Sequence, residues 1–328
     1  MKKLSVGLLV GFVVGWIVGK LGWIFAYLSQ IDPKKTLSVP QNEAKQGEQL
    51  LRREEHEAYT IVHVIHDGIE RISYLPKKRR HDTPIMMQHG MWHGAWAWQP
   101  WQELLAEWGW ESHAISLPAH GQSPEQRPLS LCTLDYYLSF LKAEIDRLPR
   151  RPILMGHSMG GALTQWYLRY LGNLEAAVLV APWTAHSLWL AGTLPSLQRD
   201  PDIVRRIMLE WDATSWVNTP KRAAKALLSD RAIVSGVELH AQLGSESMLV
   251  TYQHNPPFWK PPTDVNTPML WLGAENDGVL MLSAQEKSAA HYGAHYVVVE
   301  AAGHNLMMEW NWKETAVLID NWLTEKVG

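Results

Sequence analysis

Apolar runs alternate with amphipathic helical patterns from about residue 58 to residue 328. Runs of apolar or β-branched residues with the length of buried strands occur in eight segments. They are 59–66, 69–76, 84–90, 112–118, 152–158, 175–182, 268–277 and 295–305. The first two flank an Asp-Gly pair, which favours a tight hairpin turn. The later runs alternate with helices, so the order predicts an α/β fold with a mostly parallel eight-stranded sheet and helices on both faces.

The helical patterns are clearest in two places. Apolar residues recur at intervals of three and four in the segment 101–108, which Gly109 can terminate, and a second pattern opens at Thr133. From about residue 183 to residue 263 the chain contains several helical patterns and no convincing strand. We expect this stretch to be a helical cap inserted between the sixth and seventh predicted strands, above the sheet edge where ligands bind.

The first 28 residues form a different pattern. Residues 4–28 carry a single charge, Lys20, and are long enough as a helix to cross a bilayer core of roughly 30 Å. No small-residue cleavage site follows, so residues 1–28 are predicted to be an uncleaved transmembrane signal anchor. Residues 29–57 are polar and are predicted to tether this anchor to the catalytic domain at 58–328. A single-pass membrane protein is therefore expected.

Two features of this anchor concern its partners and its orientation. Glycines recur every four residues on one face and could allow a second helix to approach, as in a homodimer. They are Gly7, Gly11, Gly15 and Gly19. Lysines flank the apolar segment at both ends, so the side of the membrane that the catalytic domain faces stays open.

Composition narrows the function classes. The net charge is -3 and 46% of the residues are hydrophobic, which gives no electrostatic basis for binding nucleic acid. The single cysteine, Cys132, excludes a disulfide within the chain. The domain is therefore expected to fold by packing alone.

The strongest chemical motif is GHSMGG at 156–161. It follows a predicted strand and precedes a helical pattern, which is the context of a strained turn that exposes a nucleophilic serine. Ser158 is the predicted nucleophile. Gly156 and Gly160 leave room where the strand and the helix cross.

A serine needs a base and an orienting acid to become a good nucleophile. His304 follows the last predicted strand and is the candidate base. Asp277, in the loop after the seventh predicted strand, is the candidate acid, with Glu275 as the fallback. The backbone N–H groups of Met91 and Met159 are the candidate donors to an oxyanion.

The stretch QHGMWHGAWAW at 88–98 admits other interpretations. His89 and His93 are four residues apart, as are His291 and His295, but no third ligand is evident, so neither a metal nor any other cofactor is predicted. The stretch is better explained as a strand end, a turn at Gly90 and the start of a helix. Four residues are expected near the substrate pocket. They are Trp92, Trp96, His157 and Trp183.

With these motifs in sequence order, the chain from about residue 58 to residue 328 resembles the α/β-hydrolase superfamily. The segment 89–98 looks like the first loop of the plant methylesterase and hydroxynitrile lyase group. The lyases carry a hydroxyl residue where this chain has Gly90, lack the histidine at His157 and have a lysine where this chain has Asn305. The resemblance therefore implies ester hydrolysis. Epoxide hydrolases and haloalkane dehalogenases use an aspartate nucleophile, and Ser158 argues against both.

The leading expectation is a membrane-anchored serine hydrolase of the lipase, carboxylesterase or lysophospholipase type, acting on a small-molecule ester or a lipid. Two alternatives stay open. A cofactor-free oxygenase or perhydrolase could use the same triad, and a noncatalytic membrane-tethered binding module could share the fold. The sequence does not distinguish a long-chain substrate from a short one.

Overall fold

A computed structural model describes residues 2–41, 44, 47–203 and 212–327, with the backbone alone for residues 2–14. One sheet of nine strands crosses the domain in the order β1-β2-β3-β5-β4-β6-β7-β8-β9. The strands are β1 (Glu48–Glu55), β2 (Tyr59–His66), β3 (Ile69–Pro76), β4 (Ile85–Gln88), β5 (Ser112–Ser116), β6 (Ile153–His157), β7 (Ala176–Val180), β8 (Met269–Ala274) and β9 (His295–Val299). All eight predicted strands are present.

The direction of the strands changes across the sheet. Strands β1, β2, β3 and β5 pair antiparallel, whereas every pair from β5 to β9 is parallel. Asp67 and Gly68, both at positive φ, turn the chain between β2 and β3. In the parallel part the carboxyl ends of the strands meet at one edge, which places the loops after β4, β6, β8 and β9 together.

The sheet has one strand more than the eight predicted, and this ninth strand lies in the second half of the predicted tether over 29–57. Glu48–Glu55 forms β1 at the edge of the sheet, and a short helix, α2 (Pro33–Ser38), precedes it. Most of the β1 side chains are charged and partly or fully exposed, so the sequence lacks the alternation of apolar and polar positions that predicts a strand. Charged side chains on an edge strand also discourage pairing with other chains.

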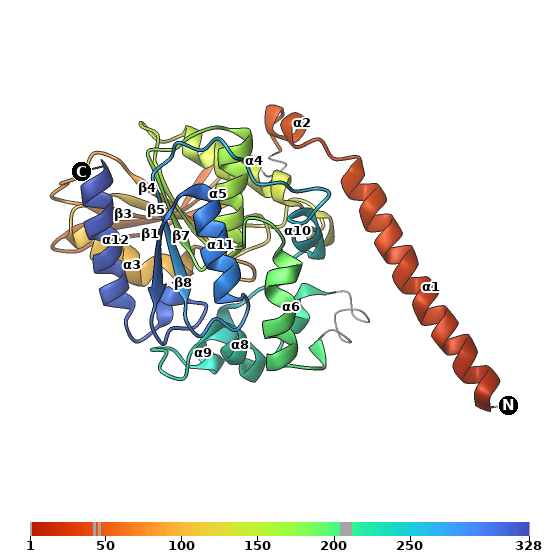
Figure 1. Ribbon diagram of the computed structural model, residues 1–328. Helices are drawn as coiled ribbons and strands as arrows, with labels where there is room; N and C mark the ends of the chain where they lie inside the picture. Colours follow the sequence, from red (N-terminus) through yellow and green to blue (C-terminus); the bar gives the residue numbers. More distant parts are fainter. Residues whose placement is uncertain (1, 42–43, 45–46, 204–211, 328) are drawn as a thin grey trace.

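Helices cover both faces of the sheet (Figure 1). On one face lie α3 (Gln99–Glu107), preceded by a 3-10 turn at Ala95–Trp98, and α12 (Trp312–Val327). On the other lie α4 (Leu134–Asp146), α5 (Met159–Tyr170) and α11 (Leu282–Tyr292). The strands β4 to β8 are buried along their whole length because both faces are covered.

The predicted cap is helical in its described residues, which contain no strand between β7 and β8. It comprises α6 (Leu188–Arg199), a 3-10 turn (Ala213–Trp216), α8 (Pro220–Leu227), α9 (Gly236–Gln242) and α10 (Met248–Gln253). Two hydrogen bonds of His254, just after α10, join this part of the cap to α5 and to the loop after β7. Its Nδ1 accepts the Trp166 indole N–H at 3.1 Å and its Nε2 donates to the Thr184 carbonyl at 2.9 Å.

The N-terminal segment is a single helix, α1 (Lys2–Ser29), that extends away from the domain (Figure 1). Its last turns pack on the cap, where Ile24 and Leu28 are buried with Leu249 of α10. Among the described residues, no helix combines the length and apolarity needed to span a bilayer. Of the predicted glycine stripe, Gly7 and Gly11 lie outside the described side chains, so dimerisation through it stays a prediction.

Candidate active site

Ser158 occupies a sharp turn between β6 and α5. Its φ of 51° lies in a region that residues with a Cβ rarely adopt. The neighbouring glycines permit the turn because a Cβ at Gly156 would lie 2.3 Å from the Gly160 carbonyl oxygen, and one at Gly160 would lie 2.1 Å from the Gln88 carbonyl oxygen. The strand and the helix therefore cross at a distance that only glycine allows, and the turn holds the serine above the sheet edge.

His304 and Asp277 lie next to Ser158 in a chain of hydrogen bonds. The Ser158 hydroxyl donates to His304 Nε2 across 2.9 Å, and His304 Nδ1 donates to Asp277 Oδ2 across 2.8 Å. The His304 and Asp277 side chains are 1% and 2% exposed, so water does not compete for these bonds. In this tautomer Nε2 is free to accept the serine proton.

The Asp277 carboxylate is fixed by its own loop. Its Oδ1 accepts the backbone N–H groups of Val279 at 2.7 Å and Leu280 at 3.0 Å, which leaves Oδ2 for His304. Glu275, the fallback acid, is exposed and accepts the Ala301 backbone N–H at 2.7 Å. The structure thus brings Asp277, and not Glu275, to His304.

The two candidate oxyanion donors flank Ser158. Met159 is the first residue of α5, and Met91 follows Gly90, where an added Cβ would lie 2.9 Å from Ser158 Cβ. Neither N–H is bonded to an acceptor within the described part of the chain. Both donors therefore remain available to a group bound beside the Ser158 hydroxyl.

The two histidines of the 88–98 stretch hold the backbone of this turn. His89 Nδ1 donates to the Gly90 carbonyl at 2.7 Å, and His93 Nδ1 donates to the Met91 carbonyl at 2.6 Å. The other nitrogen of His93 faces the Asn305 amide at 3.0 Å. Because the Gly90 carbonyl and the Met91 N–H belong to one peptide unit, holding the carbonyl also fixes the direction of the N–H.

These contacts also bear on the metal interpretation. Burial lowers the pKa of His93 to about 4, so the ring is neutral at pH 7. Its nitrogens are engaged by the backbone and by Asn305 rather than directed at a common point. In the described residues no group of three or more potential ligands could hold a metal ion.

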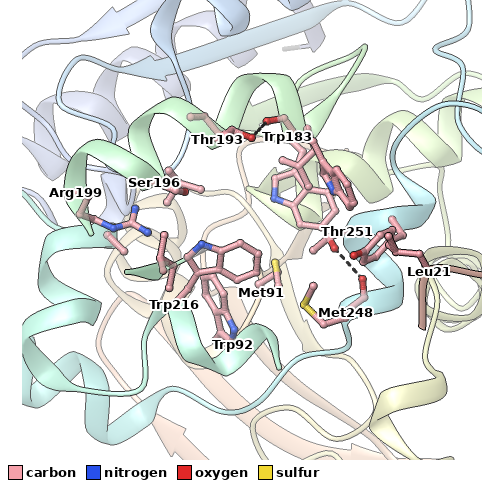
Figure 2. Close-up of a pocket in the computed structure, with 18 of the residues that line it drawn as sticks. Leu21, Met91, Trp92, Trp183, Thr193, Ser196, Arg199, Trp216, Met248 and Thr251 are labelled. Carbon is pink, nitrogen blue, oxygen red and sulfur yellow. Dashed lines mark hydrogen bonds between the residues drawn. The ribbon is translucent and has the colours of Figure 1, made fainter. Parts of the chain in front are cut away.

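A cavity of about 320 Å³ lies beneath the cap and reaches the neighbours of Ser158. Met91 and Trp183 both line it, and the Trp183 N–H donates to the Ser158 carbonyl at 3.1 Å. Most of the other lining residues are apolar (Figure 2). Most of them come from the loop after β4, the cap helices α6 and α10, the loop before α11, and α1.

The four predicted pocket residues divide into two pairs. Trp92 and Trp183 line the cavity. Trp96 and His157 are not among the described lining residues: Trp96 stacks on His93 with ring centres 5.4 Å apart, and His157 is buried behind Ser158, where its Nε2 faces the His304 carbonyl at 3.2 Å. Burial lowers the pKa of His157 well below its usual value, so this ring is neutral.

Sequence reasoning missed several wall residues. Ile17 and Leu21 of α1 line the cavity, as does Arg199 at the end of α6. Figure 2 shows Arg199 and Leu21 on opposite sides of the view, with Met91 between them. No motif marks these residues. The one usable signal was the apolar start of the cap, which includes Trp183 and Trp189.

Comparison with known proteins identifies relatives of the domain. Residues 87–316 match the model of the alpha/beta hydrolase family. Norfluorocurarine synthase 1 of Strychnos nux-vomica is 28% identical over 137 residues, 41% of this chain and 47% of that protein. Methylesterase 2 of Arabidopsis thaliana is 31% identical over 117 residues, 34% of this chain and 43% of that protein. The chain thus spans about half the length of these curated relatives.

Solved structures with the same fold include esterases and a lipase. One structure, described as a membrane phospholipase A and bacterial virulence factor, matches 99% of this chain and 99% of its own. Its TM-score is 0.59 and its sequence identity is 18%. At this identity the likeness establishes the fold alone.

Proposed function

This chain belongs to the α/β hydrolase family, and we propose that it is a serine hydrolase that cleaves carboxylic esters. The observation that carries the proposal is the hydrogen-bonded series Ser158, His304 and Asp277. A serine hydroxyl, a neutral imidazole and a carboxylate in this order are the groups that acyl transfer requires. The free N–H groups of Met91 and Met159 complete the set.

The proposed reaction proceeds in two halves. His304 Nε2 takes the proton of the Ser158 hydroxyl as its oxygen attacks the ester carbonyl, and the Met91 and Met159 N–H groups stabilise the oxyanion. His304 then gives the proton to the departing alcohol, which leaves an acyl-enzyme. Water attacks that ester with His304 as the base again, and the acid is released. Asp277 holds the imidazole and stabilises its charged form.

Ser158→Ala tests this proposal. The full-length variant should lose hydrolysis of p-nitrophenyl butyrate and labelling by a fluorophosphonate probe, with an unchanged far-ultraviolet circular dichroism spectrum. Undiminished turnover would exclude Ser158 as the nucleophile. Peracid formation or oxygen uptake that exceeds ester hydrolysis in the unaltered protein would instead favour the perhydrolase or oxygenase alternative.

We further propose that α1 anchors the domain to a membrane and that the substrate is a lipid ester. Three observations support this. Residues 4–28 carry one charge, α1 supplies Ile17 and Leu21 to the cavity, and the structure that matches nearly the whole chain is described as a membrane phospholipase A. A helix that both reaches the bilayer and lines the cavity would place the substrate's acyl chain next to its source. Sedimentation of the full chain with vesicles tests the anchor.

A further inference from the structure

The residues of helix α6 that line the cavity change from apolar to polar along the helix. Leu188 and Trp189, in its first turn, are apolar, whereas Ser196 and Arg199, in its last turns, are polar, and all four line the cavity. Residues three apart on a helix share a face, so Thr193, Ser196 and Arg199 form one polar row. Figure 2 shows this row running from Thr193 beside Trp183 to Arg199 at the far side.

The apolar end of the cavity lies against α1. The Trp189 ring contacts the ring of Tyr252 in α10 with centres 4.5 Å apart, and Tyr252 packs against the cluster that holds the last turns of α1. Ile17 and Leu21 close this end. It has the composition that an acyl chain requires.

Arg199 is the cation at the opposite end. Its guanidinium donates to the Gly278 carbonyl, and it forms no ion pair with any carboxylate in the described residues. The two nearby carboxylates are already engaged. Asp200 pairs with Arg222 Nε at 2.8 Å, and Asp277 pairs with His304. A guanidinium has five N–H donors, so Arg199 keeps donors for a ligand.

Within the described residues this partly buried arginine forms no ion pair, so an anion that binds beside it in the largely apolar cavity would stabilise it. Arginine also binds phosphate and carboxylate groups through two parallel hydrogen bonds. Met91 and Trp183, the neighbours of Ser158, lie between the two ends. A bound ester would thus place its carbonyl near them, with the acyl portion toward one end and the alcohol portion toward the other.

We propose that Arg199 binds an anionic group, a phosphate or a carboxylate, on the alcohol portion of an ester whose acyl chain lies toward α1. Ser196 lines the same end and can add a hydroxyl donor. The proposal rests on the hydrolase function proposed above and adds to it the class and the orientation of the substrate. An acylglycerol phosphate carries both parts.

A competing explanation is that Arg199 only supports the Asp277 loop through Gly278. The two explanations differ in substrate dependence. A residue that supports the loop acts on every ester, whereas a residue that binds the anion acts only on esters that carry it. The experiment therefore compares matched substrates with and without the charge.

Full-length protein in detergent is assayed with dodecanoylglycerol phosphate and dodecanoylglycerol, which share an acyl chain. A second pair, p-nitrophenyl hydrogen succinate and p-nitrophenyl butyrate, places the charge on the acyl portion instead. The variants are Arg199→Met, Arg199→Lys and, as a control, Lys225→Met. The control removes an exposed positive charge of α8 that does not line the cavity.

Arg199→Met should lower kcat/KM for dodecanoylglycerol phosphate about tenfold or more, mainly through KM, with dodecanoylglycerol and both p-nitrophenyl esters changed by less than about twofold. For Arg199→Lys the kcat/KM for dodecanoylglycerol phosphate should lie between the values of the unaltered protein and of Arg199→Met, because lysine keeps the charge and loses the planar guanidinium fork. Lys225→Met should leave the kcat/KM ratio of dodecanoylglycerol phosphate to dodecanoylglycerol unchanged.

Equal losses on charged and neutral esters would overturn the proposal in favour of loop support. A loss confined to p-nitrophenyl hydrogen succinate would overturn the orientation, because the bound anion would then lie on the acyl portion. If Arg199→Met changed the kcat/KM ratio of charged to neutral ester in neither pair, anion binding by Arg199 would be overturned. Failure of the hydrolase function has a different signature, because the unaltered protein would then hydrolyse neither neutral ester.

Discussion

The groups that surround Ser158 and the walls of the cavity above it are assembled in different ways. Ser158, Asp277 and His304 each lie in a loop after a strand of one sheet, and hydrogen bonds within and between those loops hold them. Most of the walls come from α1, α6 and α10, which meet through apolar and aromatic side chains. The comparison indicates that the chemistry is encoded by local motifs, whereas substrate selection depends on contacts between segments far apart in the chain.

The largest effect should come from the buried acid. Asp277→Asn keeps the shape of the side chain and removes the charge that orients and stabilises His304, so kcat for p-nitrophenyl butyrate should fall by about four orders of magnitude. Glu275→Gln is the matched control, because Glu275 is exposed and faces the Ala301 N–H. Equal losses of kcat in both variants would mean that any change in this loop lowers activity, and that the Asp277 carboxylate has no specific role.

The next effect concerns the turn at Gly90. In Gly90→Ala the new Cβ would lie 2.8 Å from His157 Nδ1 and 2.9 Å from Ser158 Cβ, so the turn or the serine must move. We expect kcat to fall about a hundredfold, the scale of losing one oxyanion donor. Gly22→Ala, where the structure has nothing within 4 Å of the new Cβ, should leave kcat unchanged. A fully active Gly90→Ala protein would argue against Met91 as a donor.

The third effect is a dependence of folding stability on pH through His254, which follows the cap helix α10. Burial lowers the pKa of His254 to about 4. The unfolded chain, with a pKa near 6.5, binds the proton first as the pH falls, so His254 costs stability between about pH 6.5 and pH 4. The loss should be about 2 kcal/mol between pH 7 and pH 5 and approach about 3 kcal/mol at pH 4.

His254→Gln removes this contribution. The variant should be less stable than the unaltered protein at pH 7, because the bonds to Trp166 and Thr184 are weakened, but its stability should fall less steeply toward pH 5. Urea unfolding at the two pH values measures both effects. Parallel pH profiles for the two proteins would show that His254 is not buried in its neutral form.

The sequence predicted the parts of this molecule that depend on neighbours along the chain. The positions of Ser158, Asp277 and His304 follow from where strands end, and the turn at Gly90 follows from the residues around it. Trp96 was misplaced because sequence proximity to that turn does not reveal which way a side chain points: its ring stacks on His93, away from the cavity.

The cavity walls and the edge strand could not be predicted in the same way. Most residues of strand β1 are charged, none is buried, and the strand shows no alternation of apolar and polar positions. Ile17 and Leu21 line the cavity because Ile24 and Leu28 of the same helix pack on Leu249. That contact joins α1 and α10, which are far apart in the chain, and nothing in either sequence indicates that the two helices pack together.

The smallest effect should come from substitutions in α1. They test directly whether the cavity walls, unlike the catalytic loops, select the substrate. The double variant Ile17→Ala, Leu21→Ala removes apolar contacts at the α1 end of the cavity, so kcat/KM for p-nitrophenyl dodecanoate should fall about tenfold. The short p-nitrophenyl acetate does not reach that end and should be unaffected. Val18→Ala, at a side chain that is 63% exposed, is the control on the same helix. Equal losses on long and short esters would mean that α1 stabilises the cap without selecting the acyl chain, and no loss on either would remove α1 from the substrate site.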